Sequence, residues 1–173
     1  PPLLTLETFR EKNYDVVFKF DNDMLCVGDI SELLDSKGDI NGCGVTSASN
    51  KINCGFFVLT KNVLNSDAYQ RLVDKVESWK YTTPERMNDQ AAVNSGKMND
   101  FRWESFSDNY NYRGKVNVPN YKMNMTDVKV LHWSGYMHEA HERFPKPWDI
   151  DPIQCDAQIL WEKYRDEMNE ELR

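Results

Sequence analysis

Several features that would assign this chain of 173 residues to a common protein class are missing from its sequence. There is no run of about 18 apolar residues, so we expect no membrane-spanning helix. The four cysteines show no C-x-x-C spacing, which argues against a zinc site and favours a reducing compartment such as the cytoplasm. Lys and Arg are outnumbered by Asp and Glu, and the net charge of −7 disfavours nucleic acid or an anionic membrane as a partner.

No internal repeat and no low-complexity linker interrupts the sequence, so it predicts a single folded domain. Its 40% hydrophobic and 12% aromatic residues suffice for an ordinary core, which argues against a disordered chain. An acidic protein can still bind a phosphorylated ligand if a metal ion or a local lysine offsets the repulsion.

The most informative stretch is Tyr14–Leu34, with the sequence YDVVFKFDNDMLCVGDISELL. Residues 16–20 are mainly β-branched or aromatic, which predicts a buried strand that ends at the acidic triplet. Side chains two apart on an extended chain point to the same side, so Asp21 and Asp23 can face one point in space. Two adjacent carboxylates repel each other when unpaired, so this pair predicts a bound cation.

A capped helix is expected after the acidic triplet. Asp29 and Glu32 have the spacing of an N-cap and its capping-box partner, which predicts a short helix through Leu34. The order is therefore strand, acidic tip, short connection and helix, and ligands bind at such strand ends in open α/β sheets. Acidic triplets also occur by chance in solvated turns, so the metal hypothesis needs support from the rest of the chain.

Apolar periodicity and capping residues predict the remaining elements. Helices are expected at Thr5–Glu11, after the caps Asn65 and Ser66, at Asp89–Asn94, and from Pro152 onward behind the N-cap Asp151. Buried strands are expected at Phe56–Leu59 and Val128–Trp133, an imperfect strand at Phe101–Phe106, a loop or short strand at Asp35–Lys51, and a loop at Asp108–Lys115. We expect one domain over residues 1–150, with an amphipathic helix over residues 151–173 packed on it.

Five short motifs occur in a fixed order along the chain. They are Asp21-Asn22-Asp23, Asn53-Cys54-Gly55, Asp89-Gln90, His132-Trp133-Ser134-Gly135 and Lys146-Pro147-Trp148. Their order resembles glycosyltransferase family 8, the glycogenin and bacterial lipopolysaccharide galactosyltransferase type, with its D-x-D, F-N-S-G, D-Q, H-Y-x-G and K-P-W motifs. The resemblance runs from about residue 8 to residue 148, and the ordered set is far more specific than any one motif.

The resemblance implies a GT-A fold, a Rossmann-like α/β sheet flanked by helices that holds a nucleotide-diphosphate sugar. Only about a dozen residues precede the first strand, so we expect part of the amino-terminal nucleotide-binding strands to be missing. The implied activity is that of a metal-dependent hexosyltransferase. It would move a hexose from a donor, expected to be UDP-hexose, to an acceptor glycan or another hydroxyl compound, with retention at the anomeric carbon.

The resemblance also assigns roles to individual residues. Asp21, Asp23 and His132 would bind a divalent metal, and this mixed ligand set suits Mn²⁺, with Mg²⁺ as the alternative. Lys146 and Gly135 would contact the donor diphosphate, and Asn53 would hold the donor sugar. Asp89 and Gln90 would act beside the reacting carbon. Because an amide is a poor nucleophile, front-face attack by the acceptor is favoured over a covalent intermediate at Gln90.

Each assigned residue also has a simpler interpretation. His132 could be a half-buried histidine at a strand end, and Lys146 could cover an aromatic ring with its methylene stem. Asp89 could be an N-cap, Gln90 a surface residue of its turn, and Asn53 the residue that holds a tight turn at Gly55.

Two departures from the family pattern bear on the assignment. Ten residues, Tyr136–Pro145, separate Gly135 from Lys146, and they could displace Lys146 or supply Arg143 or His138 instead. Cys54 stands where the family usually has serine, which is similar in size.

Three other functions compete with the transferase. A non-catalytic module of the same fold could bind a nucleotide sugar or a glycan. A metal-dependent nucleotidyltransferase would need a Gly-rich triphosphate loop, and a scaffold protein would leave the ordered motifs unexplained.

Overall fold

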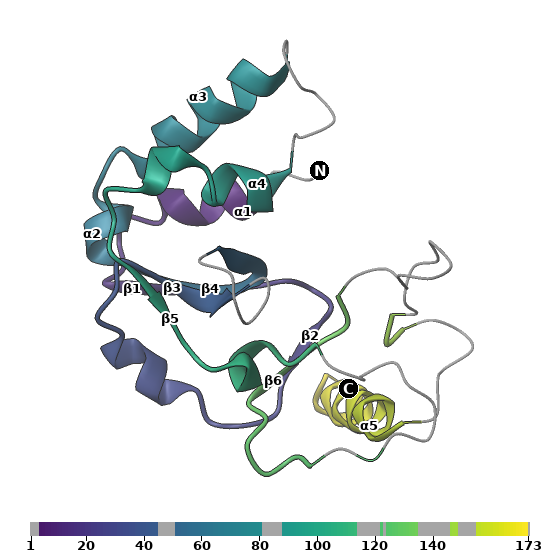
Figure 1. Cartoon of the computed structure of the whole chain (residues 1–173). Helices are drawn as coiled ribbons and strands as arrows, with labels where there is room; N and C mark the ends of the chain where they lie inside the picture. The colour runs from purple at the N-terminus through teal and green to yellow at the C-terminus, as the bar shows by residue number, and fades with distance from the viewer. Residues whose placement is uncertain are drawn as a thin grey trace. The chain divides into compact units, whose positions relative to one another are not determined.

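The computed structural model describes residues 4–44, 51–80, 88–113, 122, 124–134, 146–148 and 155–172 (Figure 1). The chain divides into two compact units. Unit 1 comprises Pro1–Asp21 and Ser31–Asp108, and unit 2 comprises Asn22–Ile30 and Asn109–Arg173. The division between Asp21 and Asn22 therefore falls inside the acidic triplet.

Among the described residues, no helix combines the length and the apolar character that a membrane span requires.

Unit 1 contains a mixed sheet with the strand order β1-β4-β3-β5. The strands are β1 (Val16–Phe20), β3 (Ile40–Gly44), β4 (Ile52–Thr60) and β5 (Trp103–Ser105). β4 pairs antiparallel with both β1 and β3, whereas β3 and β5 are parallel. The predicted strand at Phe56–Leu59 is thus part of a longer central strand, and the segment predicted as a loop or short strand contains β3.

The first strand lies at one end of this strand order and is only partly buried. Phe20 is 38% exposed, and its ring stacks on Phe56 with 4.4 Å between ring centroids. The prediction of a buried first strand is therefore wrong. A run of β-branched and aromatic residues specifies a strand, but a strand at the end of a sheet can stack some of these side chains on its one neighbour while they stay partly exposed.

β4 departs from regular pairing where the Asn53-Cys54-Gly55 motif lies. Gly42 and Gly44 of β3 pair with Phe57 and Ile52, so a step of two residues in β3 matches a step of five in β4. A bulge of this kind resets which face of the sheet the side chains occupy. As a result Cys54 and Phe57, which differ in parity along the strand, both belong to the same core cluster.

Helices α1 (Leu4–Glu7), α3 (Ala68–Lys80) and α4 (Asp89–Val93) lie together on one side of this sheet (Figure 1). Unit 1 also contains the short helices η1 (Thr8–Arg10), η2 (Ser31–Asp35), α2 (Lys61–Leu64) and η4 (Gly96–Met98). The helix expected after the caps Asn65 and Ser66 is confirmed as α3. Its Leu72 and Val76 are buried, and its Tyr69 and Trp79 pack against the same core. That core also contains Phe57 of β4 and Ala92 of α4, so it fixes α4 over the sheet.

Unit 2 contains a small antiparallel sheet of β2 (Met24–Cys26) and β6 (Val130–His132). Tyr112, directly after η5 (Asp108–Asn111), runs beside β6: its N–H donates to Val130 O at 2.9 Å, and its carbonyl accepts from the N–H of His132 at 3.0 Å. The core of unit 2 includes Leu131, Trp133 and Ala157.

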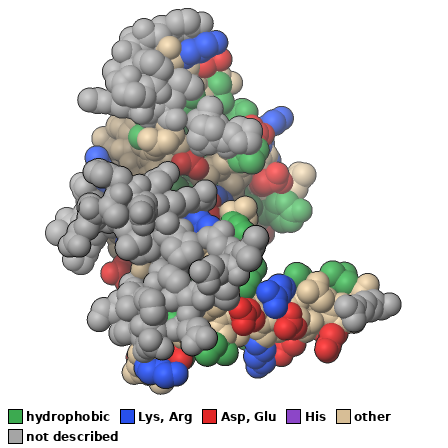
Figure 2. Space-filling model, turned by 90° about the vertical axis from the view of Figure 1, so that its right-hand side faces the viewer, with side chains coloured by type: hydrophobic (Ala, Val, Ile, Leu, Met, Phe, Trp, Pro, Cys, Tyr) green, Lys and Arg blue, Asp and Glu red, His purple; other side chains and the backbone are tan. Residues whose placement is uncertain are grey.

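The C-terminal helix α5 (Asp156–Glu171) belongs to unit 2 and begins later than the sequence predicts. Its N-cap is Cys155, in extended conformation, whereas the predicted N-cap Asp151 lies outside the described residues. The first turns of this helix, which the sequence predicts to be amphipathic, are buried at Ala157, but Met168 and Leu172 nearer its C-terminus are 55% and 78% exposed. Figure 2 shows charged and hydrophobic side chains next to one another along this exposed helix.

The packing of α3 yields a stability prediction. Replacing the fully buried Leu72 by alanine should lower the free energy of unfolding by about 2–5 kcal/mol, because a cavity forms between α3 and the sheet. The exposed Glu77→Ala on the same helix should change it by less than about 0.5 kcal/mol. Urea denaturation followed by circular dichroism compares the two variants, and equal losses would contradict the packing of α3 described above.

Candidate functional site

The backbone of unit 2 brings Asp23 to the end of β6. Met24 pairs with His132 across the two strands, so the residue before Met24 lies beside the residue after His132. The N–H of Trp133 accordingly donates to Asp23 O at 3.0 Å. Asp23 and His132, which are far apart in the sequence, are therefore placed together by strand register.

The Asp23 carboxylate is buried between two basic side chains. Its Oδ1 lies 3.4 Å from His132 Nε2, and its Oδ2 contacts the Lys146 ammonium. Asp23, His132 and Lys146 are each no more than 8% exposed. Burial opposes ionisation of the carboxyl, but the interactions with His132, when its Nε2 carries a proton, and with Lys146 outweigh it and lower the pKa of Asp23 to about 2. Its neighbours therefore favour the ionised form of this buried carboxylate.

One oxygen of this carboxylate remains available to a ligand. Within the part of the chain that the structure describes, Asp23 Oδ1 is buried and accepts no hydrogen bond. The 3.4 Å to His132 Nε2 is longer than an ordinary N–H···O bond. A buried acceptor without a donor is costly, and a cation held between oxygen and imidazole nitrogen would satisfy it.

The second ring nitrogen of His132, Nδ1, contacts Asn111 of η5. His132 Nδ1 and Asn111 Oδ1 are 2.7 Å apart, and the two residues are 2% and 1% exposed. An amide oxygen can only accept a hydrogen bond, so Nδ1 carries a proton in this arrangement. Nε2, on the Asp23 side, then either carries a second proton or offers its lone pair to a metal.

Contacts fix Lys146 both at its ammonium group and at the residues that follow it in the chain. Its ammonium contacts Asp23 Oδ2 and donates to Trp133 O. The adjoining Pro147 accepts a 2.8 Å hydrogen bond from Gln158 of α5. Trp161 of α5 makes edge contacts with Trp133 and with the residue that follows Pro147. The C-terminal helix therefore positions the lysine, and the simpler interpretation of Lys146 as a cover for an aromatic ring does not account for its contacts.

A second cluster lies in unit 1 at the β4 bulge. Gln90 Oε1 accepts hydrogen bonds from Asn53 Nδ2 and from the N–H of Cys54, both at 3.2 Å. Asn53 Oδ1 in turn accepts from the N–H of Gly55 at 3.0 Å. A backbone N–H can only donate, so it fixes the orientation of both side-chain amides. The Gln90 oxygen is thus bound to the sheet, and its Nε2 faces elsewhere.

Asp89 opens α4 but is not its N-cap. Asn88 is the N-cap, and its side chain accepts from the N–H of Ala91 at 2.8 Å. Asp89 accepts from its neighbour's N–H through Oδ1 at 2.7 Å and from the Thr5 hydroxyl through Oδ2. Both Asp89 oxygens therefore have a partner inside unit 1, and each keeps a further lone pair for a ligand hydroxyl.

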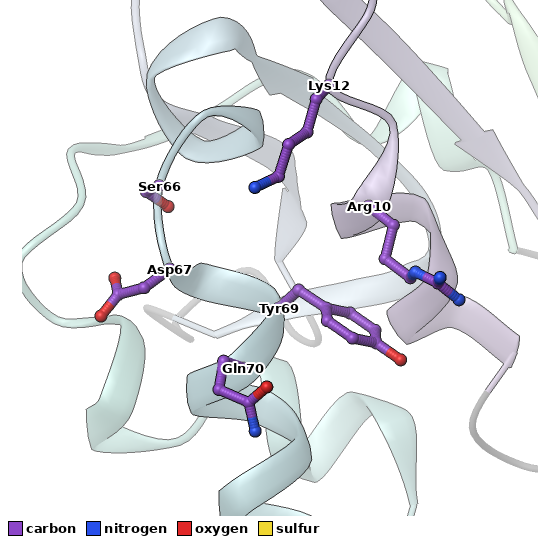
Figure 3. A pocket seen from close by; sticks show the side chains of 6 residues that line it. All are labelled: Arg10, Lys12, Ser66, Asp67, Tyr69 and Gln70. Carbon is purple, nitrogen blue, oxygen red and sulfur yellow. The ribbon is translucent and has the colours of Figure 1, made fainter.

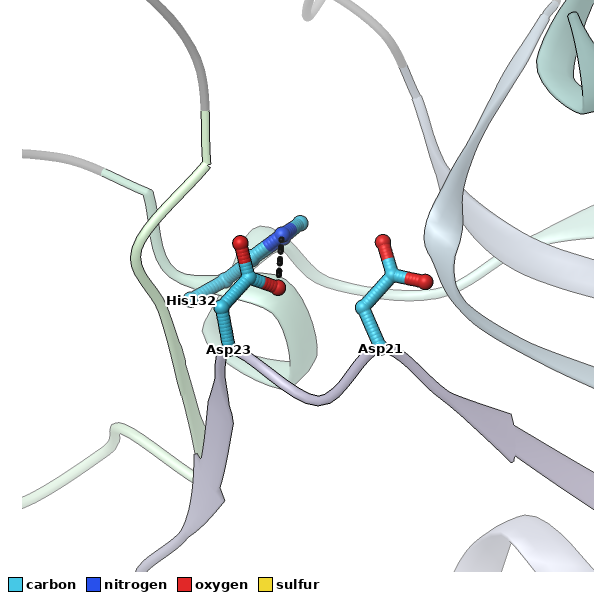
Figure 4. A group of neighbouring side chains, drawn as sticks. All are labelled: Asp21, Asp23 and His132. Carbon is cyan, nitrogen blue, oxygen red and sulfur yellow. Dashed lines mark ion pairs between the residues drawn. The ribbon is translucent and has the colours of Figure 1, made fainter. Parts of the chain in front are cut away.

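Asp21 is the last residue of the first segment of unit 1 and is separated from Asp23 by Asn22 alone. Its Oδ1 accepts from the Lys19 ammonium, and its N–H donates to Gly55 O at 2.8 Å. Figure 4 draws Asp21, Asp23 and His132, the three residues to which the motif resemblance assigns the metal. The dashed line in that view marks the ion pair between Asp23 and His132, the two members that unit 2 contains.

The sequence pointed to some of these residues and missed others. Asn111, Thr5, Lys19 and Gln158 each support a predicted site residue, yet none lies in a motif, and only spatial proximity reveals them. Gly135, together with the segment Tyr136–Pro145, lies outside the described residues.

Two hollows in unit 1 differ in whether a residue of the sequence motifs lines them. One of about 320 Å³ is bordered by Gln90, and its other lining residues are Lys51, Asn88, Ala91 and Asn94. Another of about 450 Å³, shown in Figure 3, is lined by Arg10, Lys12, Ser66, Asp67, Tyr69 and Gln70. Arg10 is already paired with Glu7 and lies over the Tyr69 ring, so this second hollow is not the candidate site.

Comparison with known proteins supports the fold but gives no sequence relative. No protein-family model matches the chain, and no curated protein matches it in sequence. Among solved structures, the glycosyltransferase GlyE of Streptococcus pneumoniae TIGR4 superposes with a TM-score of 0.65 and 18% identity, over 93% of this chain and 42% of GlyE. The galactosyltransferase LgtC, solved with donor and acceptor sugar analogues, superposes with a TM-score of 0.61 and 17% identity, over 94% of this chain and 66% of LgtC.

These neighbours are glycosyltransferases of the family 8 type, so the chain has the GT-A class of fold that the motifs predicted. The chain spans less than half the length of GlyE and about two thirds of that of LgtC. At this level of identity the likeness establishes the fold, and the activity has to be argued from the site.

The hydrogen bonds at Gln90 yield a second prediction. Gln90→Met keeps the length of the side chain but leaves Asn53 and the N–H of Cys54 without their acceptor, so the free energy of unfolding should fall by about 1–3 kcal/mol. Gln90→Glu keeps an acceptor oxygen, so its free energy of unfolding should fall by less than that of Gln90→Met. Urea denaturation of both variants provides the test, and a methionine variant as stable as the wild type would show that the amide does not anchor α4 to β4.

Proposed function

We propose that this chain is a metal-dependent hexosyltransferase. It moves a hexose from a nucleotide-diphosphate sugar, with UDP-hexose as the expected donor, to an acceptor hydroxyl with retention at the anomeric carbon. The observation that carries the proposal is the buried cluster of Asp23, His132 and Lys146. These are the residues to which the motif resemblance assigns the metal and the diphosphate, and the fold is one that glycosyltransferases use.

The residues present fit a divalent cation. Asp23 offers a buried oxygen that has no hydrogen-bond partner among the described residues, and His132 offers Nε2 at the same place. Asp21, one residue away from Asp23 along the chain, supplies the third ligand in our proposal. Two carboxylates and one imidazole suit Mn²⁺ or Mg²⁺ and leave positions for phosphate oxygens. When bound, the ion would offset the negative charge that develops on the departing diphosphate.

Lys146 adds a positive charge of the chain's own. Its ammonium is held at Asp23 Oδ2 and Trp133 O, within the cluster where we place the diphosphate. We propose that phosphate oxygens of the donor take over part of this coordination. Pre-positioned positive charge lowers the barrier most when it faces the atoms on which negative charge appears in the transition state.

The unit 1 cluster accounts for the sugar end of the proposed reaction. Because Gln90 Oε1 is bound to Asn53 and Cys54, the side chain presents Nε2, which is a donor and no nucleophile. Asp89 is fixed by Thr5 and by its own helix, so it serves to orient sugar hydroxyls. These contacts favour front-face attack by the acceptor over a covalent intermediate on either side chain.

The same contacts give a second candidate function some weight. Both oxygens of Asp89 and the oxygen of Gln90 already have structural partners, as they would in a module that binds a nucleotide sugar or a glycan without turning it over. Binding and turnover therefore have to be measured separately.

Metal binding is the first functional prediction. Asp23→Asn and His132→Gln should each weaken Mn²⁺ binding by about tenfold or more, because each removes a charged or lone-pair ligand. Asp15→Asn, which changes a carboxylate whose side chain is 85% exposed before β1, is the matched control and should bind as the wild type does. Electron paramagnetic resonance of free Mn²⁺ reports the affinity, and equal affinities in all four proteins would remove the metal from this site.

Turnover is the second functional prediction. With Mn²⁺ present, the protein should release free hexose from UDP-hexose in the absence of an acceptor, and a chelator or the Asp21→Asn substitution should abolish the release. Chromatography of the sugar product measures it, with calorimetry of UDP binding alongside. Binding of UDP without release of hexose would favour the binding module, and release that persists in Asp21→Asn would contradict a role for that carboxylate.

A further inference from the structure

Asn111 belongs to no motif, yet its side chain is hydrogen-bonded to the ring of the proposed metal ligand His132. It lies at the end of η5, and the backbone that follows it is tied to β6 through Tyr112. That tie sets Asn111 beside the imidazole, with 2.7 Å between Oδ1 and Nδ1. Both residues are almost completely buried, so water does not compete for this bond.

We propose that Asn111 is a positioning residue that fixes the tautomer of His132, so that the lone pair of Nε2 faces Asp23. This inference rests on the proposed function for its metal, but its geometry stands on unit 2 alone. A neutral imidazole has one N–H and one lone pair, and in water the form with the proton on Nε2 prevails. Donation from Nδ1 to the Asn111 oxygen selects the opposite form.

The consequence for the ligand set is direct. With the proton on Nδ1, Nε2 of His132 carries a lone pair and lies 3.4 Å from Asp23 Oδ1, which accepts no hydrogen bond among the described residues. Two electron-rich atoms then face each other across a gap that suits a cation. With the proton on Nε2, the same gap would close as a hydrogen bond and the metal would have to displace it. Outer partners that hold a ligating histidine in this way typically change metal affinity by about 10–100-fold.

Nuclear magnetic resonance of the imidazole nitrogens tests the tautomer in metal-free protein labelled with ¹⁵N-histidine, at a pH where the rings are neutral. The chain has three histidines, and His132→Gln identifies the signal. The wild type should show a protonated Nδ1 and an unprotonated Nε2 at His132. Asn111→Leu should shift the signal toward the other tautomer, whereas Asn111→Asp, which keeps an acceptor oxygen, should retain it.

Asn41→Leu is the matched control, because Asn41 is an equally buried asparagine in unit 1 and bonds to the carbonyl of Gly38. It should leave the His132 signals unchanged. Mn²⁺ titration of the same proteins should show a loss of about tenfold or more for Asn111→Leu and a small change for Asn111→Asp.

A proton on Nε2 of His132 in the wild type would overturn the inference, and that measurement does not depend on any Asn111 variant folding. An unchanged tautomer in Asn111→Leu would overturn it too. If Asn111 sets the tautomer as described but the wild type binds no Mn²⁺, the inference about His132 stands and the proposed metal-dependent transfer fails.

Discussion

The Asp23 carboxylate, buried between the ring of His132 and the ammonium of Lys146, is the interaction on which the account of this molecule depends. An ionised carboxylate can be buried only if nearby charge and hydrogen bonds compensate for lost hydration, and unit 2 is arranged to supply both. Strand register brings His132, and α5 holds the segment that carries Lys146. The carboxylate is not fully satisfied, since Oδ1 has no hydrogen-bond partner among the described residues. That incomplete compensation is the reason why we propose a ligand site here and not a structural ion pair.

The two clusters divide the chemistry between them. In unit 2 the side chains are charged and suit a cation and a diphosphate, whereas in unit 1 the amides of Asn53 and Gln90 and the carboxylate of Asp89 suit the hydroxyls of a sugar. The chain passes from one cluster to the other through the acidic triplet, with Asp21 on one side of the division and Asp23 on the other. The triplet is therefore the covalent link between the parts that we propose bind the two ends of one donor.

The sequence predicted what is encoded locally. Short apolar runs marked β1 and β4, and apolar periodicity with capping residues marked α3, because these patterns depend on neighbours within a few residues. It did not predict that β1 is half-buried or that α5 begins at Asp156, since partners distant in sequence decide burial and helix ends. The sequence also did not predict the hydrogen bonds between Asn111 and His132 and between Lys146 and Asp23. The motifs named three of these four residues, but only the β2–β6 register and the packing of α5 show that they meet.

The most direct test of the account is a crystal structure of the protein with Mn²⁺ and UDP, with data collected at a wavelength where manganese scatters anomalously. The account predicts one anomalous peak that is bonded to Asp21, Asp23 and His132 Nε2 and shared with the diphosphate. A peak at other residues, or UDP bound with no manganese at Asp23, would contradict it.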